Sequence, residues 1–156
     1  MLVSNKKHRR LFWVLFLCYL IVLTYFMFFS DGFGRSGHEG YSYNLTLFKE
    51  IKRFYTYRER LGMKSFLINT LGNIVCFMPF GFILPLISSR GGIWYNTFLL
   101  SFWLSFCIEV TQIVFQVGSF DVDDMLLNTL GGILGFICVA VVLLFRRKSD
   151  ETTGGR

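Results

Sequence analysis

The chain has 156 residues, of which 53% are apolar, 19% aromatic and only 17% charged, whereas a typical soluble domain has about 45 to 50% apolar and about 25% charged residues. Several apolar runs are long enough to cross the roughly 30 Å hydrocarbon core of a bilayer, so the composition predicts an integral membrane protein and excludes an ordinary soluble domain. The net charge of +6 comes from Lys and Arg beside these runs, where the cytoplasmic bias of positive residues accounts for it, and we expect no nucleic-acid partner.

The first predicted element is a membrane anchor at residues 11–29. It follows a basic segment at residues 1–10, which contains Lys6, Lys7, Arg9 and Arg10. The apolar run is longer than the core of a cleavable signal peptide, and no small-residue cleavage site follows it. We therefore expect this run to remain in the protein as a spanning helix.

The basic stretch at residues 30–64 contains a segment with helical periodicity. Its apolar positions are Leu45, Phe48, Ile51 and Tyr55, and the other face carries Lys49, Lys52, Arg53 and Thr56. A short helix with one basic and one apolar face is typical of the membrane interface. We expect this helix to lie on the membrane and not to cross it.

The remaining apolar runs predict three spanning helices, at residues 66–87, 94–117 and 124–145. Each run is about as long as the roughly 20 residues that a spanning helix requires. The predicted fold is therefore an all-α polytopic membrane protein with about four transmembrane helices and one interfacial amphipathic helix.

Two features qualify these helices. The run at 66–87 contains Pro79 and Pro85, and proline removes a backbone donor and clashes with the preceding turn, so this helix is expected to kink or break in its second half. The last run is followed by Arg146, Arg147 and Lys148. We expect residues 146–156 to form a basic, disordered tail.

The positive residues at both ends of the chain favour cytoplasmic termini. Four of them precede the anchor, and three follow the last spanning helix. The basic residues before residues 66–87 favour the opposite side, so this one helix conflicts with the orientation that the other three indicate.

Residues 67–77 align without gaps with residues 126–136, and seven of the eleven positions are identical. The shared Asn-Thr-Leu-Gly element indicates an internal duplication. The two repeated helices should run in the same direction across the membrane, as in a parallel repeat.

One face of the helix at 94–117 is polar. Ser101, Ser105, Glu109, Gln112 and Gln116 follow one another at intervals of three or four residues, which places them on one side of a helix. A carboxyl group inside a bilayer costs several kcal/mol unless it is paired, neutral or wetted. Glu109 must therefore have a partner inside the protein.

The candidate partners of Glu109 are Asn69 and Asn73, one turn apart, and Asn128, whose helix also carries Gly131, Gly132 and Gly135. Small residues let helices approach closely, so these groups can enclose one polar pocket. The purely structural interpretation, which we call the bland interpretation, is that these side chains only join helices, since each interhelical hydrogen bond stabilises a membrane protein by roughly 0.6 to 2 kcal/mol. Gln would serve that purpose as well as Glu, which favours a functional role.

Asp121, Asp123 and Asp124 precede the last spanning helix. One interpretation is helix capping, because an Asp at a helix start accepts backbone N–H bonds. The other is a site for a divalent cation or a polar head group, since hard cations prefer carboxylate oxygens. Both interpretations stay open, and no other cofactor is predicted.

Three separate motifs together resemble the VanZ-like family of bacterial membrane proteins. They are Asn-x-x-Gly-Asn-x-x-x-Phe-x-Pro-x-Gly-Phe-x-x-Pro at residues 69–85, Glu-x-x-Gln at 109–112, and Asp-x-Asp-Asp-x-x-x-Asn-x-x-Gly at 121–131. The resemblance covers residues 44–145, which we take as a VanZ-like domain. Members of the family often carry an Arg just before the Asp motif, where this chain has Gly118 and Ser119.

The resemblance implies a multi-pass protein of the bacterial cytoplasmic membrane, in a family associated with resistance to teicoplanin-type glycopeptides. Our leading hypothesis is a non-enzymatic envelope protein whose intramembrane pocket binds a lipid, a lipid-linked precursor or an amphiphilic drug. The predicted ligand-binding residues are Asn69, Asn73, Glu109, Gln112, Asp121, Asp123, Asp124 and Asn128.

Two alternatives belong to other classes of protein. The first is an intramembrane enzyme acting on a lipid head group, with Glu109 as general base and the three aspartates holding a metal ion. The second is a transporter or flippase that uses the broken helix and the protonation of Glu109 for alternating access. Since four helices are few for transport, this alternative requires a homo-oligomer.

Overall fold

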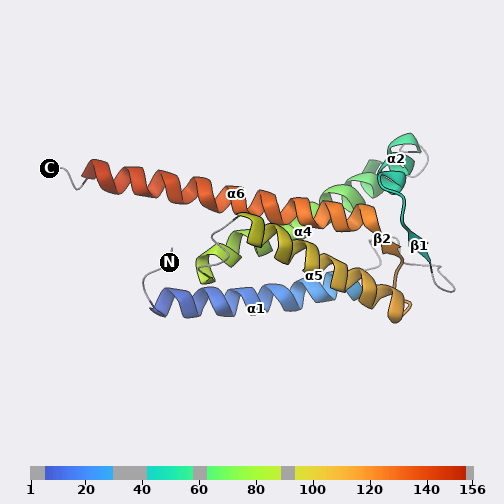
Figure 1. Ribbon diagram of the computed structural model, residues 1–156, viewed down its shortest axis with the longest axis horizontal. Coiled ribbons are helices and arrows are strands. Elements are labelled where there is room, and N and C mark those ends of the chain that lie inside the picture. Colours follow the sequence, from blue (N-terminus) through green and yellow to red (C-terminus); the bar gives the residue numbers. More distant parts are fainter. Residues whose placement is uncertain (1–5, 30–41, 58–62, 89–93, 154–156) are drawn as a thin grey trace.

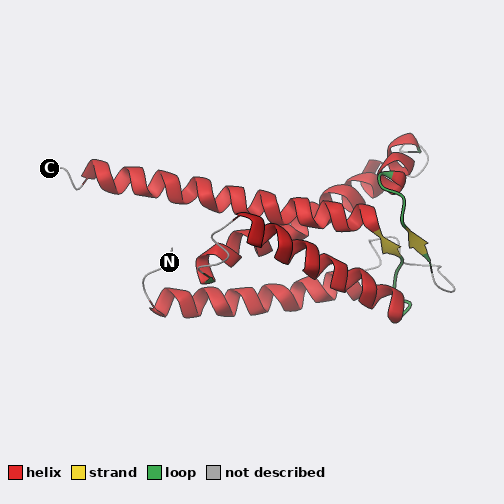
Figure 2. Ribbon diagram, viewed as in Figure 1, coloured by secondary structure: helices red, strands yellow, loops and turns green. Residues whose placement is uncertain are grey.

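The computed structural model describes residues 6–29, 42–57, 63–88 and 94–153, and in these ranges the chain is almost entirely helical (Figures 1 and 2). Four helices are long and apolar enough to cross a membrane, which confirms the predicted all-α polytopic fold. In chain order the elements are α1 (Lys6–Phe29), β1 (Tyr43–Asn44), α2 (Lys49–Thr56), α4 (Met63–Ile87), α5 (Trp94–Val114), β2 (Phe120–Asp121) and α6 (Val122–Thr153).

The long helices lie side by side along the length of the molecule, and each one runs in the opposite direction to the long helix before it in the chain (Figure 1). α1 and α5 run toward the end of the bundle that carries α2, β1 and β2, while α4 and α6 run away from it. The start of α1 and the end of α6 therefore lie at the same end of the molecule, opposite α2. The repeated segments in α4 and α6 run in the same direction, as a parallel repeat requires.

α6 packs most extensively against α4, and glycines on α6 make this approach possible. A β-carbon on Gly131 would lie 2.2 Å from the carbonyl oxygen of Ile74, and one on Gly135 would lie 1.9 Å from that of Met78. Any side chain at these two positions would collide with the backbone of α4. The packing of backbone on backbone is the kind that small residues allow between membrane helices.

α1 packs mainly against α4 through aromatic and aliphatic side chains. Phe16 lies against Phe80, with ring centroids 5.7 Å apart, and Leu23 and Met27 are buried beside Phe77. Much of the remaining surface of α1 is exposed and apolar, as expected for a helix whose other side faces lipid.

α4 continues as one helix through Pro79 and Pro85 to Ile87, so the predicted break in the second spanning helix is wrong, while the alternative of a kink stays a prediction. The hydroxyl of Tyr19 on α1 donates to the backbone carbonyl of Cys76, 2.8 Å away, in the turn before Pro79. This bond joins α1 to α4, but it does not replace the bond that Pro79 removes, because the carbonyl that Pro79 leaves without its helical donor is that of Val75, four residues earlier. The transporter alternative thus loses the broken helix on which it depended.

The predicted interfacial helix is shorter than its periodicity indicates. α2 begins at Lys49, so Leu45 and Phe48 precede it, and Phe48 has a left-handed backbone with φ 63°. The local sequence could not predict this start, because the residues before α2 bond to distant parts of the chain, as described below.

The C-terminal ends of α5 and α6 also differ from expectation. α5 ends at Val114 in a Schellman turn, in which Gln116 is left-handed with φ 54° and the Val117 amide donates to the Gln112 carbonyl at 3.0 Å. Gln116 is therefore exposed and outside the polar face. α6 continues to Thr153, so the predicted disorder is wrong for residues 146–153, since extending a formed helix costs little. Residues 154–156 of the predicted tail lie outside the described residues.

Candidate functional site

Glu109 lies on α5 and is buried, with 2% of its surface exposed. Its Oε2 accepts a hydrogen bond from the backbone amide of Asp121 at 2.9 Å. The ring of the neighbouring Phe120 packs edge-on against Phe106 of α5, with centroids 6.3 Å apart. The partner that Glu109 required thus includes the backbone of β2, which no periodicity in the sequence indicates.

β2 is positioned by a parallel pairing with β1, in which Tyr43 lies opposite Phe120 and Asn44 opposite Asp121. The side chain of Asn44 donates to Asp121 Oδ1 at 3.1 Å, and its own Oδ1 accepts the Thr46 amide at 3.1 Å. Asn44 was not among the residues predicted for the site. The signal was its spacing from Thr46, which is typical of an Asx turn.

Asp121 is the N-cap of α6, since its Oδ1 also accepts the backbone amide of Asp123 at 2.8 Å. The capping interpretation is therefore correct for this one aspartate. Asp121 is buried. Its carboxyl group bonds to the start of α6 and to Asn44 of β1, and its backbone amide bonds to Glu109.

Asp123 holds the start of α2. One carboxylate oxygen accepts the Phe48 amide, and the other accepts the Ile51 amide at 3.3 Å. These are orphan donors at the first turn of a helix, which normally need a capping side chain nearby in the chain. Here the cap comes from a residue more than seventy positions away, and it is almost completely buried.

Asp124 bonds to the next helix. Its Oδ1 accepts a hydrogen bond of 2.6 Å from the side-chain amide of Asn73 on α4. The structure thus brings together two predicted site residues from distant parts of the sequence. Asn69 lies one turn before Asn73 on α4 and is half-buried.

Two other predicted residues lie apart from these contacts. Asn128 on α6 donates to Ser105 of α5 at 2.9 Å, and Gln112 donates to the Met27 carbonyl of α1 at 2.7 Å. Both side chains are buried and join neighbouring helices. The bland interpretation, in which amides hold helices together, describes these two residues well.

The polar residues at the α2 end form one connected group, which we call the polar cluster. The three aspartates bond to different elements. Asp121 bonds to β1, Asp123 to the start of α2 and Asp124 to α4. The described ranges contain no group of three His, Cys, Asp or Glu side chains placed to hold a metal ion, and the cation site of the enzyme alternative stays a prediction. The polar cluster consists of Asn44, Asn73, Glu109, Asp121, Asp123 and Asp124.

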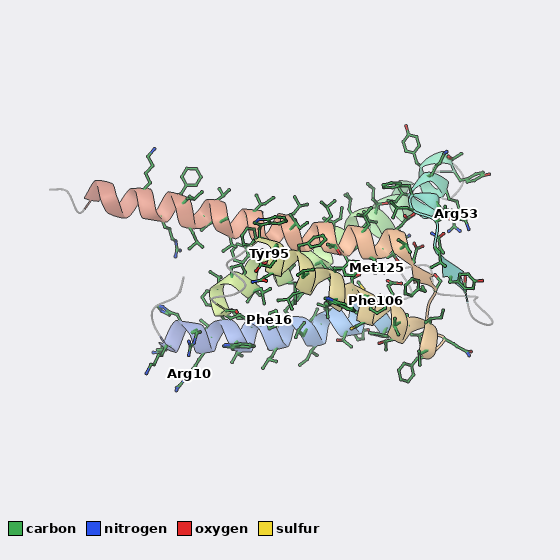
Figure 3. All side chains as sticks on the ribbon, viewed as in Figure 1. Arg10, Phe16, Arg53, Tyr95, Phe106 and Met125 are labelled. Carbon is green, nitrogen blue, oxygen red and sulfur yellow. The ribbon has the colours of Figure 1, made fainter. Side chains whose placement is uncertain are left out.

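Basic residues lie at both ends of the bundle. Figure 3 shows Arg10 at the end where the chain begins and Arg53 on α2 at the opposite end. The polar cluster lies at the α2 end, because β1, β2 and the start of α6 lie there (Figure 1). It therefore lies toward one membrane surface and not at the centre of the bundle.

Comparisons with known proteins give one consistent result. The family model described as VanZ/LLP1 matches residues 16–145, which include every residue of the polar cluster. Protein VanZ from Enterococcus faecium is 34% identical over 65 residues, which make up 42% of this chain and 40% of that protein. The alignment thus spans less than half of that relative's length. No solved structure matches the chain.

Proposed function

The chain belongs to the VanZ/LLP1 family of multi-pass membrane proteins, and from this premise we propose that it binds an amphiphile at the α2 end and thereby lowers sensitivity to teicoplanin-type glycopeptides. The amphiphile is a membrane lipid, a lipid-linked precursor or the drug itself. The polar cluster provides the contacts for its head group.

One observation carries this proposal: exposed apolar side chains are attached directly to a buried polar cluster. Tyr43, Leu45 and Phe48 are more than half exposed. The same short segment carries the groups that bond to the polar cluster. The Asn44 side chain bonds to Asp121, and the Phe48 amide bonds to Asp123. An acyl chain and a polar head group would both find suitable surfaces within this short segment.

The chemistry of Glu109 supports a role beyond joining helices. It is one of the largest fully buried side chains in the described ranges, and it is ionisable. A glutamine would accept the Asp121 amide equally well and would not carry the cost of burying a carboxyl group. An acid at this position is expected when a ligand, or a change of protonation, makes use of it.

The location completes the proposal. We propose that the termini are cytoplasmic in the bacterial cell membrane, as their positive residues favour. The polar cluster then lies toward the outer surface, where glycopeptides meet the membrane. Binding there would change access to a lipid-linked target without any catalytic step.

The test is drug susceptibility in a deletion strain that carries wild type, Glu109→Gln or Asp124→Asn, with membrane levels matched by immunoblot. We expect wild type to raise the inhibitory concentration of teicoplanin and both variants to lose at least half of that increase. The matched control is Gln116→Asn, because Gln116 is an exposed amide outside the cluster and Asn accepts its left-handed backbone. Full protection by both variants would overturn the proposed role of the cluster.

A further inference from the structure

Two polar atoms in the interior of the bundle lack hydrogen-bond partners among the described residues. They are Ser101 Oγ on α5 and Asn128 Oδ1 on α6. Their residues are 0% and 1% exposed respectively. An unpaired polar atom is costly in an apolar interior, so nearly all such atoms in proteins are paired with protein or with ordered water.

The two atoms lie on facing helices within one turn of each other. Asn128 donates to Ser105, which follows Ser101 by one turn on α5. Ser101 Oγ itself contacts α6 at Gly132, one turn after Asn128, where a β-carbon would come within 2.0 Å of it. Ser101 and Asn128 therefore lie about one turn apart in the same interface between α5 and α6.

From this placement we propose that a single water molecule is bound between α5 and α6 and bridges Ser101 Oγ and Asn128 Oδ1. Water fits both atoms, because it can donate to the amide oxygen and either donate to or accept from the hydroxyl. Reversing the Asn128 amide would leave its nitrogen as the unpaired atom, and water would accept from that nitrogen as well. Ser101 and Asn128 are both neutral, so neither side chain would be a charged ligand for a cation.

The bridge would lie at Ser101, about two turns of α5 from Glu109 along the polar face. It is distinct from the polar cluster, and it does not depend on the proposed function. In the region where Gly132 leaves no side chain to fill the interface, water would supply the contact that joins α5 to α6.

The sign of a stability change tests this proposal. If Ser101 Oγ is truly unpaired, Ser101→Ala removes a costly group and raises the unfolding temperature of the protein in nanodiscs. If water bridges the two residues, Ser101→Ala breaks the bridge and lowers that temperature by about 2 to 4 °C. The matched control is Thr111→Val, since Thr111 is only partly buried and its hydroxyl forms an exposed bond within its own helix, to the Cys107 carbonyl.

A double-mutant cycle and a structural measurement complete the test. We expect Ser101→Ala with Asn128→Ala to lower the unfolding temperature by less than the sum of the single effects, because both remove the same bridge. Additive effects, or a neutral Ser101→Ala, would overturn the proposal. Should Asn128→Ala fail to fold, water-edited solid-state NMR of the wild type decides, since the Asn128 side chain must show magnetisation transfer from bound water.

Discussion

Asp121, Asp123 and Asp124 lie within four positions of each other, yet each has a different role. Asp121 caps α6 and bonds to Asn44, Asp123 caps α2, and Asp124 bonds to Asn73 on α4. Successive side chains at a helix start point in different directions, about 100° apart around the axis. This geometry explains why three neighbouring carboxylates join three elements and do not gather around one ion.

We expect Asp123→Ala to release the start of α2. The amides of Phe48 and Ile51 would lose their acceptor, which costs about 1 to 3 kcal/mol when the donors stay buried. Hydrogen exchange followed by mass spectrometry should show faster exchange at residues 48–52, while peptides of α1 stay unchanged. Lys49→Ala is the control, because Lys49 lies on α2 with an exposed side chain. Unaltered exchange at residues 48–52 in Asp123→Ala would contradict the capping role.

At the scale of elements, the glycines of α6 decide which helix it contacts. The sequence analysis expected them to bring Asn128 toward the third spanning helix, α5. Gly131 and Gly135 instead face α4, and Gly132 faces Ser101 of α5. Asn128 does bond to Ser105 of α5, so the expected contact exists. Two of the three glycines, however, pack against α4 and not against α5.

We expect Gly135→Ala to destabilise the bundle by an amount on the order of 1 to 3 kcal/mol, because the new methyl group would collide with the backbone of α4 at Met78. Thermal unfolding in nanodiscs would measure the loss. Gly118→Ala is the matched control, since a β-carbon there meets only ordinary contacts with Gln112, the nearest at 3.4 Å. Equal stability of the two variants would show that α4 and α6 can separate without cost.

At the scale of the whole molecule, the fold separates two ends with different chemistry. The described chain begins and ends at one end of the bundle, and the polar cluster with α2 lies at the other. This arrangement also explains the conflict over helix orientation, because the basic residues of α2 lie at the end opposite the basic termini. The positive-inside rule thus cannot be satisfied by every loop of this chain.

Cysteine labelling tests the orientation that we propose. In a background without the four native cysteines, we expect Tyr57→Cys to react with a membrane-impermeant maleimide in intact protoplasts, because Tyr57 is exposed at the α2 end. Lys148→Cys, exposed near the end of α6, should react only after the membrane is permeabilised. The reverse pattern would place the termini outside, and reaction of both from outside would contradict the arrangement of the helices.

The sequence by itself determined the membrane class, the number of spanning helices and the polar face of α5. These follow from hydropathy and from a period of 3.6 residues, which depend only on residues close together in the chain. The repeat in α4 and α6 was visible for the same reason. The burial of Ser101, Ser105, Glu109 and Gln112 agrees with the face that the spacing indicates.

Only the tertiary structure decided how these helices form a site. The bonds of Asp123 to the Phe48 and Ile51 amides, and of Asn44 to Asp121, join residues 72 to 77 positions apart. The bond from the Tyr19 hydroxyl of α1 to the Cys76 carbonyl of α4 joins residues 57 positions apart. Such contacts depend on how the helices pack in space, so no local pattern of residues predicts them.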